Sequence, residues 1–306
     1  MIATRALVRE SASDDVVELR PRLLGLAYRM LSDYDEAEDV VQDAYLRWQR
    51  ADQHAIRSPE AWLVTVTTRL AVDRLRRLDA ERAHYPGPWL PEPIATDAPV
   101  VASSVPSPNE SVELASDLSV ALLVLLEQLR PEERAAFLLR DVFNTGYEEI
   151  ARILERSEDA VRQMVHRARA RVHAERPRVA LPPGEHERLL DRFRAALAAD
   201  DAAELIALLS PDVVLASDGG GRASAARNRL TGPDRVSRFL LGITRKSHQV
   251  YERTRLNGEP GLLALQNGVI TSAYSLEIDS HGIRAVHIVR NPDKLGHTVR
   301  LTEPLV

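Results

Sequence analysis

The chain has 306 residues, of which 44% are hydrophobic, and it carries a formal net charge of −5 with no cysteine. Domains usually hold roughly 100 to 200 residues, so we expect two or three of them. The acidic balance excludes a uniformly basic nucleic-acid binder, and any DNA contact must come from a local patch. The lack of cysteine excludes disulfides, thiolate metal sites and cysteine nucleophiles.

The sequence predicts neither a membrane span nor a metal site. An apolar run such as Val120–Leu126 is far shorter than the roughly 20 residues that a spanning helix needs. The N-terminal letters MIATRALVRESASDD lack the continuous apolar segment of a signal peptide. The nine histidines show no tight ligand spacing. We therefore expect a cytoplasmic, unprocessed chain without a metal or other cofactor.

Three amphipathic helices are predicted within residues 1–85, which we assign to one small bundle. Asp33 and Glu36 stand where a capping box would separate the first two helices. The third helix opens at Ser58, an N-cap residue, with Pro59 in its first turn, and runs to about Arg77. The apolar positions of the first two helices are Leu19, Leu23, Leu26 and Met30, then Ala37, Val40, Val41, Ala44, Tyr45 and Trp48.

Residues 86–110 are predicted to be a proline-rich linker. The letters PGPWLPEPIATDAPVVASSVPSP hold seven prolines and little helical periodicity, which favours a partly extended chain. Within them Trp89, Leu90 and Pro91 are unusual, because a flexible spacer has no use for large apolar side chains. One interpretation is a chance aromatic residue, and the other is a docking point that holds the linker to a folded surface.

Residues 111–176 are predicted to be helical and to end in a helix-turn-helix. Helical periodicity resumes at Ser111 and continues to about Ala174, and Ser157 is a suitable N-cap for the last helix. Such a helix fits a DNA major groove, where arginine and glutamine reach base edges. The alternative is an ordinary solvated helix face, and Glu155 stands where a glycine often eases the turn. The residues expected to face outward are Arg162, Gln163, His166 and Arg169, with Arg167 and Arg171 at the flanks.

Residues 177–306 are predicted to be an α+β domain, in which helices precede strands. The letters GLLALQ, VITSAYSLEI and IRAVHIVRN read as three strands. The turn Asn267-Gly268 joins the first two, and a turn from Asp279 to Gly282 joins the last two. The prediction is a curved antiparallel sheet with helices on one face.

Two blocks of the sequence resemble a known family. DYDEAEDVVQDAYLRW followed by SPEAWLVTVTTRLAVDRLRR resembles the second conserved region of bacterial sigma factors, and LRPEERAAFLLRDVFNTGYEEIARILERSEDAVRQMVHRARARV resembles the fourth. Together, over about residues 16–174, they resemble an extracytoplasmic-function sigma factor. The resemblance implies two all-α sigma domains and, as partners, core RNA polymerase and promoter DNA.

The same resemblance implies roles for particular residues. The β′ coiled coil of core polymerase would bind Asp39, Val40, Gln42 and Asp43, and an acidic ridge suits a basic partner. The third helix would read and open the promoter, with the basic side chains of Arg69, Arg74, Arg76 and Arg77 following phosphates. Relatives often carry asparagine at the position of Arg69. We expect Trp62 to belong to the core rather than to a base-stacking surface.

The last domain resembles a SnoaL-like domain of the nuclear-transport-factor-2 superfamily. Three short motifs are similar to those of the sigma-J-like group, in which this domain is a fused regulatory extension. The loop DGGGR can be a tight turn, a phosphate loop or a docking loop, and NPDKL can be a plain turn or a contact with the sigma domains or with the linker. The motif residues are Trp89, Leu90 and Pro91; Asp218, Gly219, Gly220, Gly221 and Arg222; and Asn291, Pro292, Asp293, Lys294 and Leu295.

The sequence thus predicts a non-enzymatic transcription initiation factor whose last domain tunes its activity. Two alternatives remain open. The SnoaL-like pocket could hold a small apolar ligand, or convert one with Asp218, Tyr274 or His287 as general acid or base. A repressor that never touches polymerase is the other alternative, but it would need no acidic polymerase-binding helix.

Overall fold

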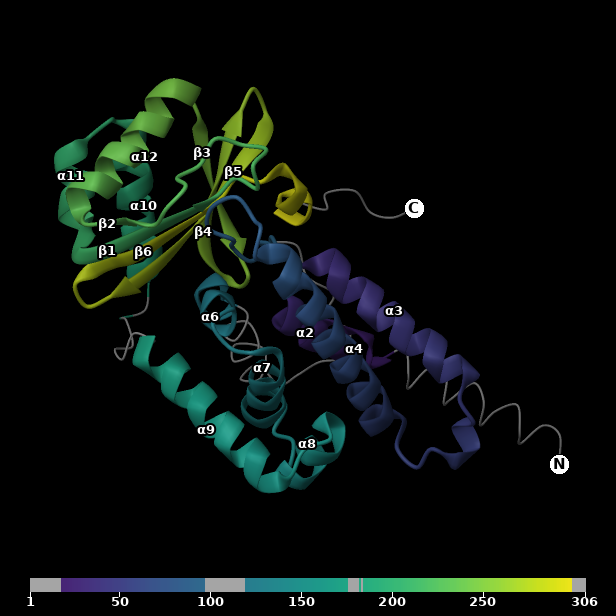
Figure 1. Cartoon of the computed structure of the whole chain (residues 1–306). Helices are drawn as coiled ribbons and strands as arrows, with labels where there is room; N and C mark the ends of the chain where they lie inside the picture. Colours follow the sequence, from purple (N-terminus) through teal and green to yellow (C-terminus); the bar gives the residue numbers. More distant parts are fainter. Residues whose placement is uncertain (1–17, 97–118, 176–181, 183, 299–306) are drawn as a thin grey trace. The chain divides into compact units, whose positions relative to one another are not determined.

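Figure 1 shows the computed structural model, which describes residues 18–96, 119–175, 182 and 184–298. The described chain forms two compact units. The first holds residues up to 81 together with 125–174, and the second holds 82–96, 119–124 and the residues from 175 onward. No helix in these described ranges is long and apolar enough to cross a bilayer.

The first half of unit 1 is the predicted bundle of three helices. The side chain of Asp33 accepts a hydrogen bond from the Glu36 N–H at 3.0 Å, and Ser58 Oγ accepts one from the Ala61 N–H at 3.2 Å, so both predicted N-caps are present. The third helix runs beyond the predicted end at Arg77. The elements are α2 (Arg20–Leu31), α3 (Tyr34–Arg50), the 3-10 turn η1 (Gln53–Ala55) and α4 (Pro59–Arg82).

The second half of unit 1 contains the predicted helix-turn-helix, formed by α8 and α9. Glu155 ends α8 in the left-handed region, with φ of 54°, which a glycine would adopt at less cost. Ser157 caps α9, since its Oγ accepts from the Ala160 N–H at 3.2 Å. Residues 111–118 of the predicted helical stretch lie outside the described residues. The elements are α6 (Val120–Leu126), α7 (Pro131–Phe137), the π-helical η2 (Leu138–Val142), α8 (Tyr147–Leu154) and α9 (Glu158–Glu175).

Unit 2 is built on a six-stranded sheet with the order β2-β1-β6-β5-β4-β3. The predicted meander is β4, β5 and β6, and both residues of the Asn267-Gly268 turn have positive φ. Sequence reasoning missed β1 and β3, and it did not foresee that β1 pairs parallel to β6, which makes the sheet mixed. The strands are β1 (Leu209–Asp218), β2 (Leu230–Thr231), β3 (Val250–Leu256), β4 (Glu259–Gln266), β5 (Val269–Asp279) and β6 (Gly282–Val289).

The two faces of this sheet bury different partners. Helices α10 (Glu185–Ala198), α11 (Ala202–Leu208) and α12 (Pro233–Ser247) cover one face and enclose the larger core with Phe193, Leu240 and Tyr274. The other face carries a smaller apolar cluster. There Ala216, Leu263 and Val289 of the strands pack with Leu90 of the linker and Leu295, which follows the last strand. The described part of the linker, residues 86–96, is therefore part of the folded unit rather than a free spacer.

Candidate functional site

The parallel pairing of β1 with β6 places two sequence motifs at one edge of the sheet. Parallel strands end at the same side, so Asp218 at the end of β1 meets the residues that follow β6. The Asp218 carbonyl accepts hydrogen bonds from the N–H groups of Arg290 at 2.7 Å and Asn291 at 3.0 Å. DGGGR and NPDKL, about 70 residues apart in the chain, are thereby joined through their backbones.

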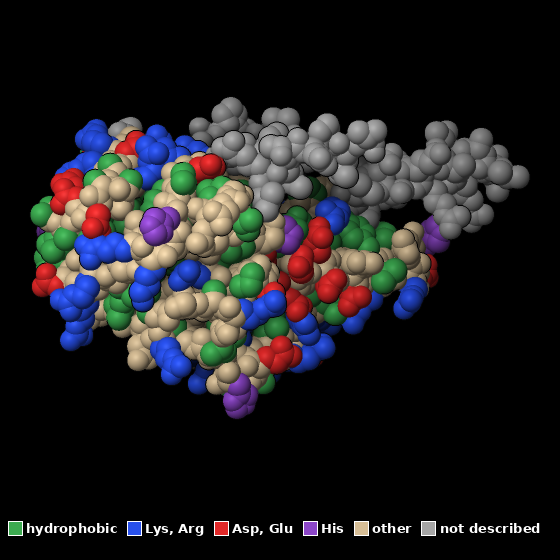
Figure 2. Space-filling view, turned by 90° about the horizontal axis from the view of Figure 1, so that it is seen from above, with side chains coloured by type: hydrophobic (Ala, Val, Ile, Leu, Met, Phe, Trp, Pro, Cys, Tyr) green, Lys and Arg blue, Asp and Glu red, His purple; other side chains and the backbone are tan. Residues whose placement is uncertain are grey.

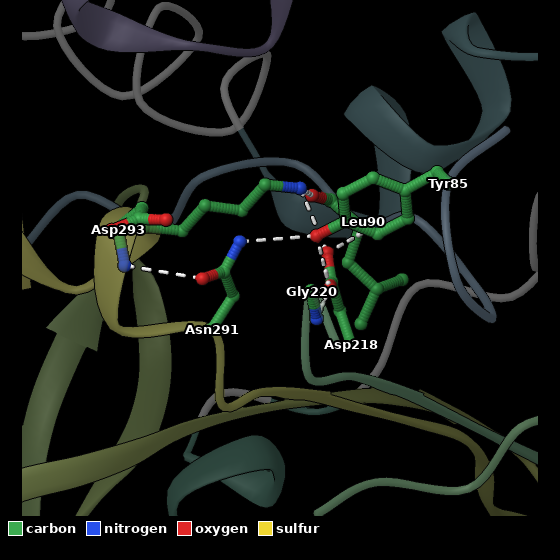
Figure 3. Close-up of polar contacts among 7 residues, drawn as sticks. Tyr85, Leu90, Asp218, Gly220, Asn291 and Asp293 are labelled. Atoms are coloured by element: carbon green, nitrogen blue, oxygen red, sulfur yellow. Dashed lines mark hydrogen bonds and ion pairs between the residues drawn. The ribbon is translucent and has the colours of Figure 1, made fainter. Parts of the chain in front are cut away.

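The carboxylate of Asp218, which is fully buried, collects four donors from separate segments (Figure 3). One oxygen accepts from the Tyr85 hydroxyl at 2.6 Å and the Gly220 N–H at 3.0 Å. The other accepts from the Leu90 N–H at 2.9 Å and from Lys294 Nζ at 2.7 Å. A buried carboxylate is stable only when it is hydrogen-bonded and neutralised, and here both conditions hold.

Lys294 completes the contact between the linker and the sheet. Besides its ion pair with Asp218, its Nζ donates to the Leu90 carbonyl at 2.7 Å and lies 3.8 Å from the centre of the Trp89 ring. Arg82 also lies over the Trp89 ring, at 3.6 Å, so two cations contact one indole. We call Tyr85, Trp89, Leu90, Asp218, Gly220, Asn291 and Lys294 the linker clamp.

Tyr85 enters this clamp as a neutral hydrogen-bond donor. Burial raises the pKa of its phenol, and the hydrogen bond to Asp218 and the charge of that carboxylate raise the pKa further. A hydrogen bond from Asn291 Nδ2 to the Tyr85 oxygen, at 3.1 Å, acts in the opposite sense. Tyr85 therefore stays protonated, and its hydroxyl donates to Asp218, throughout the physiological pH range.

The three glycines of DGGGR are required by close approach. A Cβ on Gly219 would lie 2.2 Å from the Ala223 carbonyl oxygen, and one on Gly220 would lie 2.4 Å from Asn291 Nδ2. Gly221, with φ of +72°, would place a Cβ 2.9 Å from Pro86 Cγ. The loop thus faces NPDKL and the linker, and its Gly220 N–H is used by Asp218 rather than by a phosphate.

Beyond the clamp, the linker continues along unit 2 and forms one isolated antiparallel β-bridge with it. Glu92, which is buried, pairs with His297 Nδ1 at 2.7 Å. Ala95 bridges Leu256 at the end of β3, and the Thr96 N–H donates to the Arg255 carbonyl at 2.9 Å. Residues 97–110 of the predicted linker lie outside the described residues.

Most of the predicted motif residues meet at this clamp, but not all contribute equally. Pro91 and Leu295 are buried beside it, and Pro292 begins the 3-10 turn η3 (Pro292–Lys294), which a second turn η4 (Gly296–Thr298) follows. Arg222 and Asp293 form an ion pair with each other, with both side chains more than half exposed. Sequence reasoning missed Tyr85, Arg82, Glu92 and His297, which carry no recognisable pattern.

Helix α9 presents a face with a polar centre and arginine flanks. Val161, Val165, Ala168 and Val172 are buried, as predicted. At 3.6 residues per turn, Gln163, His166 and Ala170 lie opposite that buried row. Arg162 and Arg169 lie on one side of this centre, and Arg167 and Arg171 lie on the other. The sequence predicts that Arg162 and Arg169 face outward, and their side chains are 56% and 43% exposed.

Nearly all arginines predicted to contact DNA take part in ion pairs. A pair with both partners exposed, such as Arg162–Glu158, is worth about 0–1 kcal/mol, so a phosphate can compete with its acidic partner. On the face seen in Figure 2, acidic and basic side chains are likewise interspersed. Arg77, which follows Arg74 and Arg76 on α4, is also exposed. The pairs are Arg69–Glu155, Arg74–Glu36, Arg76 with Asp73 and Glu132, Arg162–Glu158, Arg167–Glu133 and Arg169–Asp141.

Arg69 differs from the others because it binds protein backbone. Its Nε and one Nη donate to the carbonyls of Ile153 and Arg152, each at 2.9 Å, and it lies 3.1 Å from Glu155. These carbonyls belong to the last turn of α8, where a cation is favoured by the helix dipole. In the described state, Arg69 therefore caps α8 instead of presenting its whole guanidinium to a ligand.

The acidic ridge on α3 has three exposed members rather than four. Asp39, Gln42 and Asp43 are exposed, with Leu46 40% exposed one turn further along. Val40 is only 6% exposed and packs in the core of the bundle. The prediction of Val40 as a surface contact was therefore wrong, because its position in the helical repeat faces inward.

Trp62 lines an open pocket of about 450 Å³ in unit 1, so it is not simply a core residue. It is half-buried and packs edge-on against Trp48, with ring centres 5.4 Å apart. Arg47, Arg57 and Arg69 also line the pocket. An aromatic wall with several cations suits an unstacked base and its phosphate.

The catalytic candidates of the last domain do not converge on one site. Asp218 is occupied by the clamp. Tyr274 is buried in the larger core, and burial raises its pKa well above the ordinary value. His287 projects from the opposite face of the sheet and contacts Glu277 at 2.8 Å. In the described ranges, no group of three or more histidine, aspartate or glutamate side chains is arranged to hold a metal ion.

Comparisons with known proteins identify the family and the fold that the chain resembles. A sigma-70 region 2 family model matches residues 16–81, and a sigma-70 region 4 model matches residues 119–172. The chain is 40% identical to the ECF RNA polymerase sigma factor SigJ of Mycobacterium tuberculosis over 74% of its length and 72% of that protein. It is 30% identical to a probable ECF RNA polymerase sigma factor, SigI, of the same species, over 90% of this chain and 92% of that one. The crystal structure of SigJ superposes with a TM-score of 0.72 at 32% identity, over 93% of this chain and 98% of that chain.

Proposed function

Because the chain belongs to the extracytoplasmic-function family of RNA polymerase sigma factors, we propose how its two units divide the work of promoter-specific initiation. Unit 1 contains both sigma-70 regions and carries the contacts to core polymerase and promoter. Unit 2 holds the segment between those regions and sets how readily they engage. As a partner of RNA polymerase, the chain would act in the cytoplasm.

Helix α9 reads the upstream promoter element in this proposal. Its polar centre, Gln163 and His166, suits base edges in the major groove, where glutamine pairs with adenine. The arginines on both flanks suit the phosphates that border the groove on either side. Two observations favour this role. The buried row of α9 leaves these side chains exposed, and the sequence from Ala160 to Ala174 contains no acidic residue.

Region 2 contributes two further contacts. The exposed Asp39, Gln42 and Asp43 on α3 bind the β′ coiled coil of core polymerase. The pocket beside Trp62 accepts an unpaired base of the opened promoter, while the basic residues of α4, Arg74, Arg76 and Arg77, follow the backbone. In this state Arg69 must leave the end of α8 before it can contact DNA.

The linker clamp is the single observation that supports a regulatory role for unit 2. The clamp holds residues 85–90 through a buried ion pair, two hydrogen bonds to the Leu90 backbone and an indole that two cations contact. A fixed linker limits the separation of the regions that it joins, so loosening the clamp should change promoter activity. We propose no catalysis for this unit. Arg194, Gln249 and Tyr251 border an open cleft of about 400 Å³ in this unit, which is a candidate place for a small ligand.

The test is transcription in vitro with purified core polymerase on a library of genomic fragments. Wild-type chain should start transcription at a discrete set of promoters, and Lys294→Met should change the rate at those promoters severalfold. Arg222→Ala, which breaks only the exposed pair with Asp293, is the matched control and should behave as wild type. No core-dependent initiation would refute the sigma activity, and equal rates for all three chains would refute the regulatory role.

A further inference from the structure

Glu133, near the start of α7, joins the two arginines on one flank of α9. One carboxylate oxygen accepts from Arg167 Nε at 3.1 Å, and the other accepts from Arg171 Nη1 at 2.9 Å. The Glu133 side chain is 7% exposed, whereas both arginine side chains are about half exposed, at 51% and 47%. One buried carboxylate therefore accepts a hydrogen bond from each of two half-exposed guanidinium groups.

Stability alone does not account for this arrangement. Pairs with exposed arginines contribute little to folding, while burying a carboxylate is costly. Glu133 is also the third residue of the helix, near the Arg130 N–H at 3.5 Å, and a buried glutamine could accept that bond as well. What a carboxylate supplies and a glutamine does not is a separate, negatively charged acceptor oxygen for each of the two guanidinium groups.

The contacts leave donors of both arginines for another partner. Glu133 uses only the Nε of Arg167 and one Nη of Arg171, so each guanidinium keeps further N–H groups on its exposed side. Two positive charges share one negative charge, so the flank stays net positive. Arg169 on the other flank differs, because Asp141 occupies both its Nε and one Nη. The flank next to Glu133 is thus the one with most donors left to bind a phosphate.

We propose that Glu133 is a positioning residue that holds Arg167 and Arg171 ready to bind two neighbouring DNA phosphates. This inference rests on the proposed role of α9 in promoter binding. An arginine side chain loses considerable rotamer freedom when it binds, and a tether that fixes it beforehand reduces that loss. Glu133 never touches DNA itself and acts only through the two guanidinium groups.

The experiment measures binding of reconstituted holoenzyme to a promoter fragment selected in the transcription test, at several salt concentrations. Glu133→Gln should weaken binding about fivefold to tenfold and lower the salt slope by about one. The double variant Arg167→Ala with Arg171→Ala should lower the slope by about two. Adding Glu133→Gln to that double variant should change nothing further, because the groups through which it acts are gone.

Glu148→Gln is the matched control, since it removes one exposed acidic charge from the same domain. The proposal is overturned if Glu133→Gln equals this control, if it strengthens binding at an unchanged slope, or if it weakens binding equally in the double variant, which would indicate a purely structural role. If the double arginine variant binds like wild type, the promoter-binding role of α9 fails, and the proposal for Glu133 fails with it.

Discussion

Replacing Lys294 by methionine should release the linker while leaving unit 2 folded. The change keeps the side-chain volume but removes the cation from a pair whose side chains are 8% and 0% exposed. Breaking such a pair costs about 3–5 kcal/mol. Asp218 keeps three other donors, from Tyr85, Gly220 and Leu90, so we expect the lower end, about 3 kcal/mol. This energy corresponds to about a hundredfold change in the opening equilibrium.

Hydrogen exchange at the Leu90 amide measures that opening directly, because this N–H donates to Asp218. In Lys294→Met it should exchange about a hundredfold faster than in wild type, while amides of β5 keep their protection. Arg222→Ala removes only an exposed pair and should change the rate by no more than about fivefold. The reasoning is refuted if the Leu90 amide of Lys294→Met exchanges no faster than that of Arg222→Ala.

Three further outcomes are expected. Gly220→Ala should speed hydrogen exchange at the Leu90 amide as Lys294→Met does, because the added Cβ would collide with Asn291. A Leu90 exchange rate equal to that of wild type would contradict this. Asp43→Lys should lower affinity for core polymerase about tenfold in a competition assay, whereas an unchanged affinity would remove the α3 ridge from the interface. For Glu277, burial acts to raise the pKa, but the hydrogen bond with His287 and the charges of His287, Arg284 and Arg229 together outweigh it, and the net pKa is lowered. Because the pKa of Glu277 is lower in the folded chain, its ionised carboxylate stabilises the fold when the pH is above the ordinary pKa of about 4.3. This stabilisation is lost as the pH falls below that value. Glu277→Gln should therefore lose less Tm than wild type between about pH 5 and pH 3.

Features fixed by neighbouring residues could be predicted from the sequence. The cap at Asp33, the Asn267-Gly268 turn and the buried row of α9 each depend on a few residues in succession, and all three are present. Val40 shows the limit of motif transfer. A family motif names a stretch of helix, whereas the helical repeat decides which of its side chains reach the surface.

The clamp could be predicted only in part. The three motifs were expected to be related, but which of their atoms meet depends on the parallel pairing of β1 with β6, a contact between distant segments. Tyr85 follows a helix and precedes a proline-rich stretch, and nothing in that pattern distinguishes it from a surface tyrosine. Its role follows from the position of Asp218, which the sequence does not encode locally.

The distance along the chain between the partners of the clamp has a consequence for synthesis. Leu90 is made 204 residues before Lys294, which at about 5–20 residues per second is a delay of about 10–40 s. Both sigma regions leave the ribosome during that interval, before the residues that hold the linker exist. Each newly made molecule therefore passes through a period in which both sigma regions are complete but the linker between them is not yet held by the clamp.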